Sequence, residues 1–149
     1  MSEAVRDFSQ CYGHDFEDLK VGMSAAIGRT VTEADIAIFA GISGDTNPVH
    51  LDAEFAASTM FGERIAHGML SASFISAVFG TKLPGPGCIY LGQSLNFKAS
   101  VKVGETVVAR VTVRELVAHK RRAFFDTVCT VAGKVVLEGH AEIYLPARQ

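Results

Sequence analysis

The chain has 149 residues, of which 48% are hydrophobic and 20% are charged. This length and composition predict one globular domain with a substantial core and leave too few residues for two. The formal net charge of −2 gives no reason to expect nucleic acid as a partner. The sequence contains no run of about 18 apolar residues, the length that a membrane span needs. Its first residues also lack the apolar stretch of a signal peptide. We therefore expect a cytoplasmic protein that binds neither nucleic acid nor membrane.

The cysteine pattern argues against both a disulfide framework and a metal centre. There are three cysteines, Cys11, Cys88 and Cys129, and they stand far apart in the chain. An odd number without CxxC spacing is typical of neither a disulfide scaffold nor a structural zinc site, which needs four ligands. We predict no metal, and we interpret Cys88 and Cys129 as small core residues.

The first half of the chain has one clear helix signal. Residues 1–15 are mixed and polar and predict an N-terminal arm, which leaves residues 16–149 as a single domain. A short strand is expected over Ser24–Thr30. A helix is expected to begin at Thr32, because Thr32 and Asp35 have the spacing of a capping box.

The segment His67–Phe79 predicts a helix of an unusual kind. It carries no formal charge unless His67 is protonated, and its apolar residues face every direction with small Ser and Ala between them. A helix that is apolar all round is a buried helix. In a chain of this size, other elements must pack around it. The following Thr81–Gly87 segment is rich in proline and glycine and should end it.

From Cys88 onward the hydrophobic pattern changes to a period of two. One predicted strand has its apolar residues on one face, at Val107, Ala109, Val111 and Val113. Two later segments, 124–131 and 135–145, alternate in the same way and are joined by a turn at 132–134. A charge-free helix followed by long antiparallel strands predicts an α+β fold in which the sheet curls around the helix.

The loop Ser43–His50, SGDTNPVH, is the first candidate for chemistry. Asp45 and His50 are two titratable groups with complementary proton roles, and Asn47 and Pro48 stiffen the chain between them. A carboxylate and an imidazole held close together are able to bind one water, remove its proton and return a proton elsewhere. The alternative is an Asx-turn aspartate beside an ordinary loop histidine.

The start of the predicted buried helix is the second candidate. A helix N-terminus has unpaired N–H groups and a partial positive charge. Gly68 allows a ligand to approach that backbone closely. Such a place suits a thioester carbonyl that becomes enolate-like in a transition state. The alternative is that Gly68 only permits tight packing of helix on sheet.

Three stretches together resemble one known family. Phe39–His50, with Ala56 six residues on, is similar to the full hydratase-2 motif of MaoC-like dehydratases. Ala66–Leu70 and Ile89–Phe97 resemble that family's helix start and following strand. The resemblance spans roughly Phe16–Pro146. It is closest to the small (R)-specific enoyl-CoA hydratases that feed polyhydroxyalkanoate synthesis.

The resemblance implies a fold, an activity and a set of site residues. The fold is a hot-dog domain that forms a homodimer with its active sites near the subunit interface. Asp45 and His50 would be the catalytic dyad for hydration of a 2-enoyl-CoA thioester, and Gly68 would supply the oxyanion amide. Ser76 matches an active-site serine, although a serine bonded back to a helix carbonyl explains it too. The reaction needs no metal or organic cofactor, because the CoA arrives on the substrate.

Two further expectations concern the ends of the substrate. Ser76 and Phe79 share a helix face, so Phe79 would close the acyl tunnel and favour short chains of roughly four to six carbons. A core role for Phe79 explains it equally well. The basic cluster 119–122 is ordinarily solvated charge, but near a dimer interface it would meet the CoA phosphates.

Other functions fit part of the pattern. A related enzyme acting on a mesaconyl-type CoA thioester or an acyl-carrier-protein thioester would have the same motif. A thioesterase fits less well, because Asp-Thr-Asn-Pro-Val-His is the hydratase pattern. A non-catalytic acyl-CoA-binding subunit would not need both Asp45 and His50.

Overall fold

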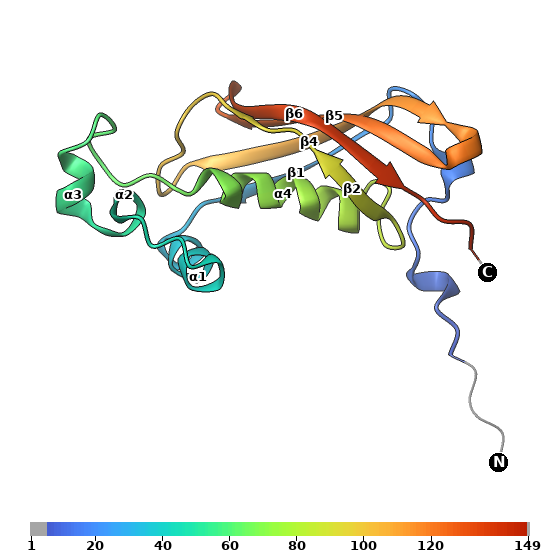
Figure 1. Cartoon of the computed structure of the whole chain (residues 1–149), viewed down its shortest axis with the longest axis horizontal. Coiled ribbons are helices and arrows are strands. Elements are labelled where there is room, and N and C mark those ends of the chain that lie inside the picture. The colour runs from blue at the N-terminus through green and yellow to red at the C-terminus, as the bar shows by residue number, and fades with distance from the viewer. Residues whose placement is uncertain (1–5, 149) are drawn as a thin grey trace, which may run out of the picture.

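One antiparallel sheet and one long helix make up most of the structure. The computed structural model describes residues 6–148. Six strands form a single sheet. Five of them follow the order β1-β4-β5-β6-β2, and the sixth, the short strand β3, pairs with β6. Figure 1 shows the helix α4 lying along one face of this sheet, with three shorter helices at one end of the molecule and the two ends of the described chain toward the other. This is the predicted α+β hot-dog arrangement.

The element bounds follow the chain order. The strands are β1 (Ser24–Thr30), β2 (Ile89–Gln93), β3 (Asn96–Phe97), β4 (Thr106–Val117), β5 (Arg122–Val131) and β6 (Lys134–Tyr144). The α-helices are α1 (Glu33–Ser43), α2 (Pro48–Leu51), α3 (Ala53–Ala57) and α4 (Gly68–Thr81). Short 3₁₀ turns occur at Ser9–Cys11, Phe16–Asp18 and Ala118–Lys120.

The core lies between α4 and the inner face of the sheet. The alternating residues of β4 are all buried there, which confirms the period-two prediction for Val107, Ala109, Val111 and Val113. The inner face of α4 meets them with Leu70, Ser71, Phe74, Ile75, Val78 and Phe79. The opposite face of α4 is exposed in the single chain. The sheet therefore covers one side of this charge-free helix.

The α1–α3 segment carries the motif loop, and its structure begins as predicted. Thr32 caps α1, with its Oγ1 accepting from the Asp35 N–H at 3.1 Å, and the Asp35 carboxylate accepts from the Thr32 N–H at 2.9 Å. The second half of the predicted loop is different, because a new helix, α2, begins at Pro48. Proline at the first helical position loses no hydrogen bond, and the Asn47 side chain caps the helix by accepting from the Val49 N–H.

The N-terminal residues bind the far end of the domain. The Gly13 and His14 N–H groups donate to the carbonyls of Pro86 and Pro84, in the loop between α4 and β2. Arg121 forms ion pairs with Asp15 at 2.8 Å and with Glu17. In residues 6–148, no helix is long and apolar enough to cross a membrane.

Candidate active site

Asp45 lies in a tight loop that leaves α1 through a left-handed residue. Gly44 ends α1 with a φ of 77°, a conformation that glycine adopts without strain. One carboxylate oxygen of Asp45, Oδ1, accepts from the Asn47 N–H at 3.2 Å, which makes an Asx turn. The turn holds the carboxylate and leaves Oδ2 free to face His50. An Asx-turn role for Asp45 is therefore compatible with a role in acid–base chemistry, because the two roles use different carboxylate oxygens.

His50 is held on α2 with its ring orientation fixed. Its Nδ1 lies 2.7 Å from the carbonyl oxygen of Ile65. A carbonyl only accepts, so Nδ1 carries a proton, and in the neutral tautomer that this bond selects the lone pair is on Nε2. That Nε2 lies 4.0 Å from Asp45 Oδ2. The His50 side chain is buried, while 52% of the Asp45 side chain is exposed. The structure thus brings the two predicted residues together; Asp45 lines an open pocket, and His50 lies next to Asp45 but is not among the residues that line it.

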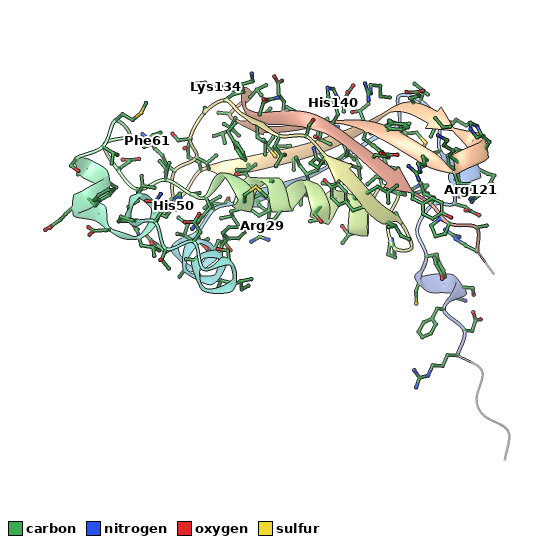
Figure 2. All side chains as sticks on the ribbon, in the orientation of Figure 1. Arg29, His50, Phe61, Arg121, Lys134 and His140 are labelled. Atoms are coloured by element: carbon green, nitrogen blue, oxygen red, sulfur yellow. The ribbon has the colours of Figure 1, made fainter. Side chains whose placement is uncertain are left out.

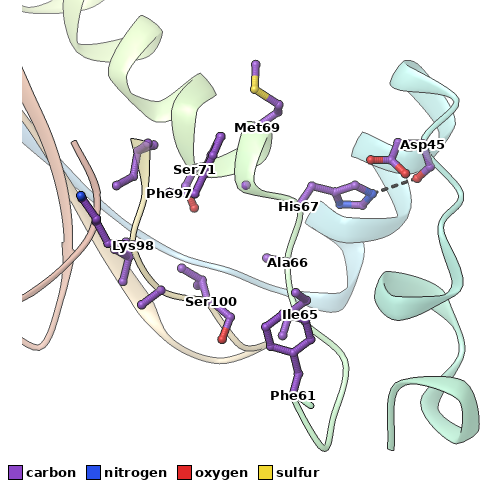
Figure 3. Close-up of a pocket in the computed structure, with 15 residues that line it drawn as sticks. Asp45, Phe61, Ile65, Ala66, His67, Met69, Ser71, Phe97, Lys98 and Ser100 are labelled. Atoms are coloured by element: carbon purple, nitrogen blue, oxygen red, sulfur yellow. Dashed lines mark hydrogen bonds between the residues drawn. The ribbon is translucent and has the colours of Figure 1, made fainter. Parts of the chain in front are cut away.

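A third group, His67, joins this pair, and sequence reasoning did not single out its side chain. Its Nε2 donates to the backbone carbonyl of Asp45 at 2.9 Å, as the dashed line in Figure 3 shows. Its ring stacks on that of His50 with centroids 3.8 Å apart, and Phe39 packs at 4.9 Å. His67 is 2% exposed, and its Nδ1 has no hydrogen-bond partner in the described chain. His67 therefore fixes the Asp45 loop against His50.

These three residues resemble a metal-binding set in composition only. Asp45, His50 and His67 each offer one ligand atom, and the three atoms lie within 4.8 Å of one another. However, the two imidazoles are stacked with an interplanar angle of 29°. An ion about 2 Å from both nitrogens would lie far out of at least one ring plane, whereas a metal binds along the in-plane lone pair. We interpret the cluster as an acid–base site.

Gly68 is the first residue of α4, directly after His67. Its N–H has no protein partner among residues 6–148, as expected in the first turn of a helix. The Phe97 ring packs against Gly68 so closely that a Cβ built there would lie 2.6 Å from Phe97 Cε1. A side chain at this position would displace that ring. The glycine keeps the helix terminus accessible.

A cavity of about 450 Å³ connects these features. Asp45 and His67 line one end, Gly68, Met69 and Ser71 line the helix side, and Phe97–Ser100 with Leu137 line the sheet side. Figure 3 shows this arrangement. The walls are mostly apolar, with a few polar groups directed inward, as is typical of pockets for small organic ligands.

The other predicted site residues lie away from this cavity. Ser76 is exposed on α4. Phe79 is 1% exposed and packs edge-on against Tyr90 and Phe125, with ring centroids 5.1 and 4.9 Å away. Tyr90 is only partly buried in this cluster, and the desolvation it experiences there raises its pKa to about 12. Neither Ser76 nor Phe79 touches the cavity of the single chain.

The basic cluster is distant from the dyad and already has partners. Figure 2 shows Arg121 at the opposite end of the molecule from His50. Arg121 pairs with Asp15 and Glu17, and Arg122 pairs with Glu142 at 2.7 Å. Within one chain these arginines do not reach the cavity.

Comparisons with known proteins agree with this architecture. The MaoC like domain family matches residues 18–139. A protein of Rhodospirillum rubrum, named (R)-specific enoyl-CoA hydratase, is 59% identical over 135 residues, which are 91% of this chain and 94% of the relative. The solved structure of the unliganded R-hydratase PhaJ1 from Pseudomonas aeruginosa superposes with a TM-score of 0.86 at 47% identity, covering 91% of this chain and 88% of the other.

A second solved structure supports the same grouping. The (R)-hydratase of Aeromonas caviae, described as involved in PHA biosynthesis, superposes with a TM-score of 0.85 at 44% identity. The alignment covers 87% of this chain and 99% of the A. caviae chain. The protein is a hot-dog-fold member of the MaoC-like dehydratase family.

Proposed function

We propose that this protein is an (R)-specific enoyl-CoA hydratase, which adds water to a trans-2-enoyl-CoA and forms the (R)-3-hydroxyacyl-CoA. The observation that carries the proposal is the approach of His50 Nε2 to Asp45 Oδ2, 4.0 Å apart at the edge of an apolar cavity. The relatives named (R)-specific enoyl-CoA hydratase, at up to 59% identity, support the substrate class and the stereochemistry.

The dyad geometry suits a single bound water. A water that donates to both acceptors through bonds of about 2.8 Å would span 4.0 Å with an angle near 90° between its bonds. The His50 lone pair and the Asp45 carboxylate are both acceptors, so both of the water's protons are engaged. Its oxygen lone pairs then face the cavity, toward C3 of the bound enoyl group.

The start of α4 completes the reaction. The Gly68 N–H donates to the thioester carbonyl oxygen, which withdraws charge and makes C3 electrophilic. The dyad removes one proton from the water as the water oxygen bonds to C3, and it returns that same proton to C2 as the enolate collapses. The second water proton stays on the new C3 hydroxyl. We assign the proton transfers to the Asp45–His50 pair as a unit, because the two side chains face one another 4.0 Å apart. His67 holds the Asp45 loop in place.

Removal of either dyad group tests the assignment. Asp45→Asn and His50→Gln should each lower kcat by about 10²-fold or more while the fold survives. The assay is the loss of crotonyl-CoA absorbance, with chiral analysis of the product. Asp126→Asn and His140→Gln are matched controls, because these residues form an exposed pair at 2.9 Å on the outer sheet face. Near-normal hydration by either folded dyad variant would contradict the proposal.

A substrate panel separates the related functions. We propose short acyl chains, so kcat/KM should fall from crotonyl-CoA to dodecenoyl-CoA. Higher activity on a mesaconyl-type CoA or on an acyl-carrier-protein thioester would identify the sister activities. Release of free CoA thiol would reveal a thioesterase. Binding without turnover would identify a non-catalytic acyl-CoA-binding subunit.

We also propose a homodimer that forms through the β2 edge of the sheet. Within residues 6–148, β2 pairs with β6 alone. Ile89, Tyr90 and Leu91 are 38–45% exposed along it. An apolar edge strand with unpaired backbone groups favours pairing with another strand. A second chain there would also approach the exposed face of α4 that carries Ser76. Sedimentation at micromolar concentration should give twice the chain mass.

A further inference from the structure

The Ser71 hydroxyl is buried but has no hydrogen-bond partner. Ser71 is 2% exposed, and its Oγ finds neither donor nor acceptor in the described chain. Buried polar groups are nearly always bonded, so an unpaired hydroxyl in a well-packed core needs a reason. The nearest other serine of this helix, Ser73, behaves differently. The Ser73 hydroxyl, on the same helix, donates to the Leu70 carbonyl at 2.5 Å, as helix serines commonly do.

The position of Ser71 places this hydroxyl beside the start of the helix. In an α-helix each side chain tilts toward the N-terminus and covers the preceding turn. Ser71 lies three residues after Gly68, so its Oγ lies over the turn that begins at the Gly68 amide. Both residues line the cavity. Figure 3 shows the Ser71 oxygen directed into the space between the start of α4 and the segment carrying Lys98 and Ser100.

The backbone around Ser71 is anchored. The Cys129 thiol on β5 donates to the Ser71 carbonyl at 3.6 Å. Cys129 is fully buried, and burial raises its pKa to about 12, so the thiol stays protonated as a donor. This contact ties the helix to the sheet at Ser71.

We propose that the Ser71 O–H is a second donor to the thioester carbonyl oxygen, beside the Gly68 N–H. The inference rests on the proposed hydratase function. A carbonyl oxygen has two lone pairs and accepts two donors, and an enolate oxygen binds them more strongly. The attacking water is held by acceptors, at Asp45 and His50, and not by donors. The substrate atom that lies by Gly68 and requires a donor is the thioester oxygen.

The test removes the hydroxyl and reads the polarisation of the carbonyl. Ser71→Ala should lower kcat by about 10-fold to 10²-fold, with KM changed less than threefold, because the bond strengthens in the transition state. Ser73→Ala is the matched control and should leave both constants unchanged. Ser71→Cys, which keeps the size but donates weakly, should resemble Ser71→Ala and serves if the alanine variant folds poorly.

A spectroscopic measurement separates binding from a merely structural role. A conjugated dienoyl-CoA bound to the Asp45→Asn variant should absorb at longer wavelength than in water, because donors polarise its carbonyl. Adding Ser71→Ala should shrink that shift. A lowered melting temperature with an unchanged shift and an unchanged kcat would overturn the inference while leaving the hydratase function intact. If wild-type protein neither hydrates crotonyl-CoA nor shifts the dienoyl spectrum, the proposed function fails and the inference with it.

Discussion

Gly68→Ala tests whether the open start of α4 is required for activity. A Cβ at this position lies 2.6 Å from Phe97 Cε1 and 2.7 Å from Cδ1. Carbon atoms in contact are normally about 3.5–4.0 Å apart, so the ring must move by about 1 Å. Phe97 is 53% exposed and sits on a two-residue strand, so it is free to move. We therefore expect the free energy of unfolding to change by less than about 1 kcal/mol.

The effect on activity should be much larger than the effect on stability. The added methyl sits beside the amide proposed to bind the thioester oxygen, and the displaced Phe97 ring is part of the cavity wall. Misplacement by about 1 Å at a reacting centre costs about 10²-fold in rate, which corresponds to about 2.7 kcal/mol. We expect kcat/KM for crotonyl-CoA to fall by about that factor, with unfolding measured in parallel by urea titration.

Two further variants identify the cause of the loss. Gly68→Ala combined with Phe97→Ala should stay as inactive as Gly68→Ala if the methyl blocks the amide, and should recover to the Phe97→Ala level if the ring alone is at fault. Gly41→Ala lies in the interior of α1, where a Cβ meets nothing within 4 Å, and it calibrates the stability effect of replacing a helix glycine. A kcat/KM for folded Gly68→Ala within threefold of wild type would refute the reasoning.

Two predictions concern stability. Thr32→Ala removes the cap on the Asp35 N–H and should destabilise the fold by about 1 kcal/mol in urea titration, whereas Thr32→Ser should retain most of it. Burial raises the pKa of Cys129 from 9.0 to about 12, so above pH 9 the unfolded chain loses this proton while the folded chain keeps it. The free energy of unfolding should therefore fall with rising pH, by up to about 1.4 kcal/mol per pH unit. In Cys129→Ala this fall should be shallower from pH 9 to 11. Equal pH slopes for the wild type and the variant would contradict the prediction.

Local signals predicted the elements that depend on neighbouring residues. The Thr32–Asp35 spacing placed the start of α1, and the alternation from Val107 to Val113 identified the buried face of β4. The same local reasoning missed α2, which begins at Pro48. A four-residue helix has too few residues to show a hydrophobic period, and the turn-forming residues that cap it look the same in a loop.

The residues of the candidate site also fall into two groups: those that a local motif suggested and those that only the fold brings together. Asp45 and His50 are five positions apart, so a motif within one segment was enough to suggest them. His67 lies 17 residues beyond His50 and stacks on its ring only because the chain between α3 and α4 returns to the motif loop. Ser71 resembles any small residue of a charge-free helix. Its significance depends on the missing partner and on the cavity beside it, and neither is visible in a sequence.

By itself, the sequence determined the α+β class, the caps and faces of its main elements, and the aspartate and histidine of the motif loop, because these follow from interactions between residues close along the chain. The tertiary structure decided the distance between the Asp45 and His50 side chains, the stacking of His67, the closeness of Phe97 to Gly68, and the exposure of one face of α4. Those features depend on how the sheet and the helices pack, and packing joins residues whose separation along the chain carries no local signal.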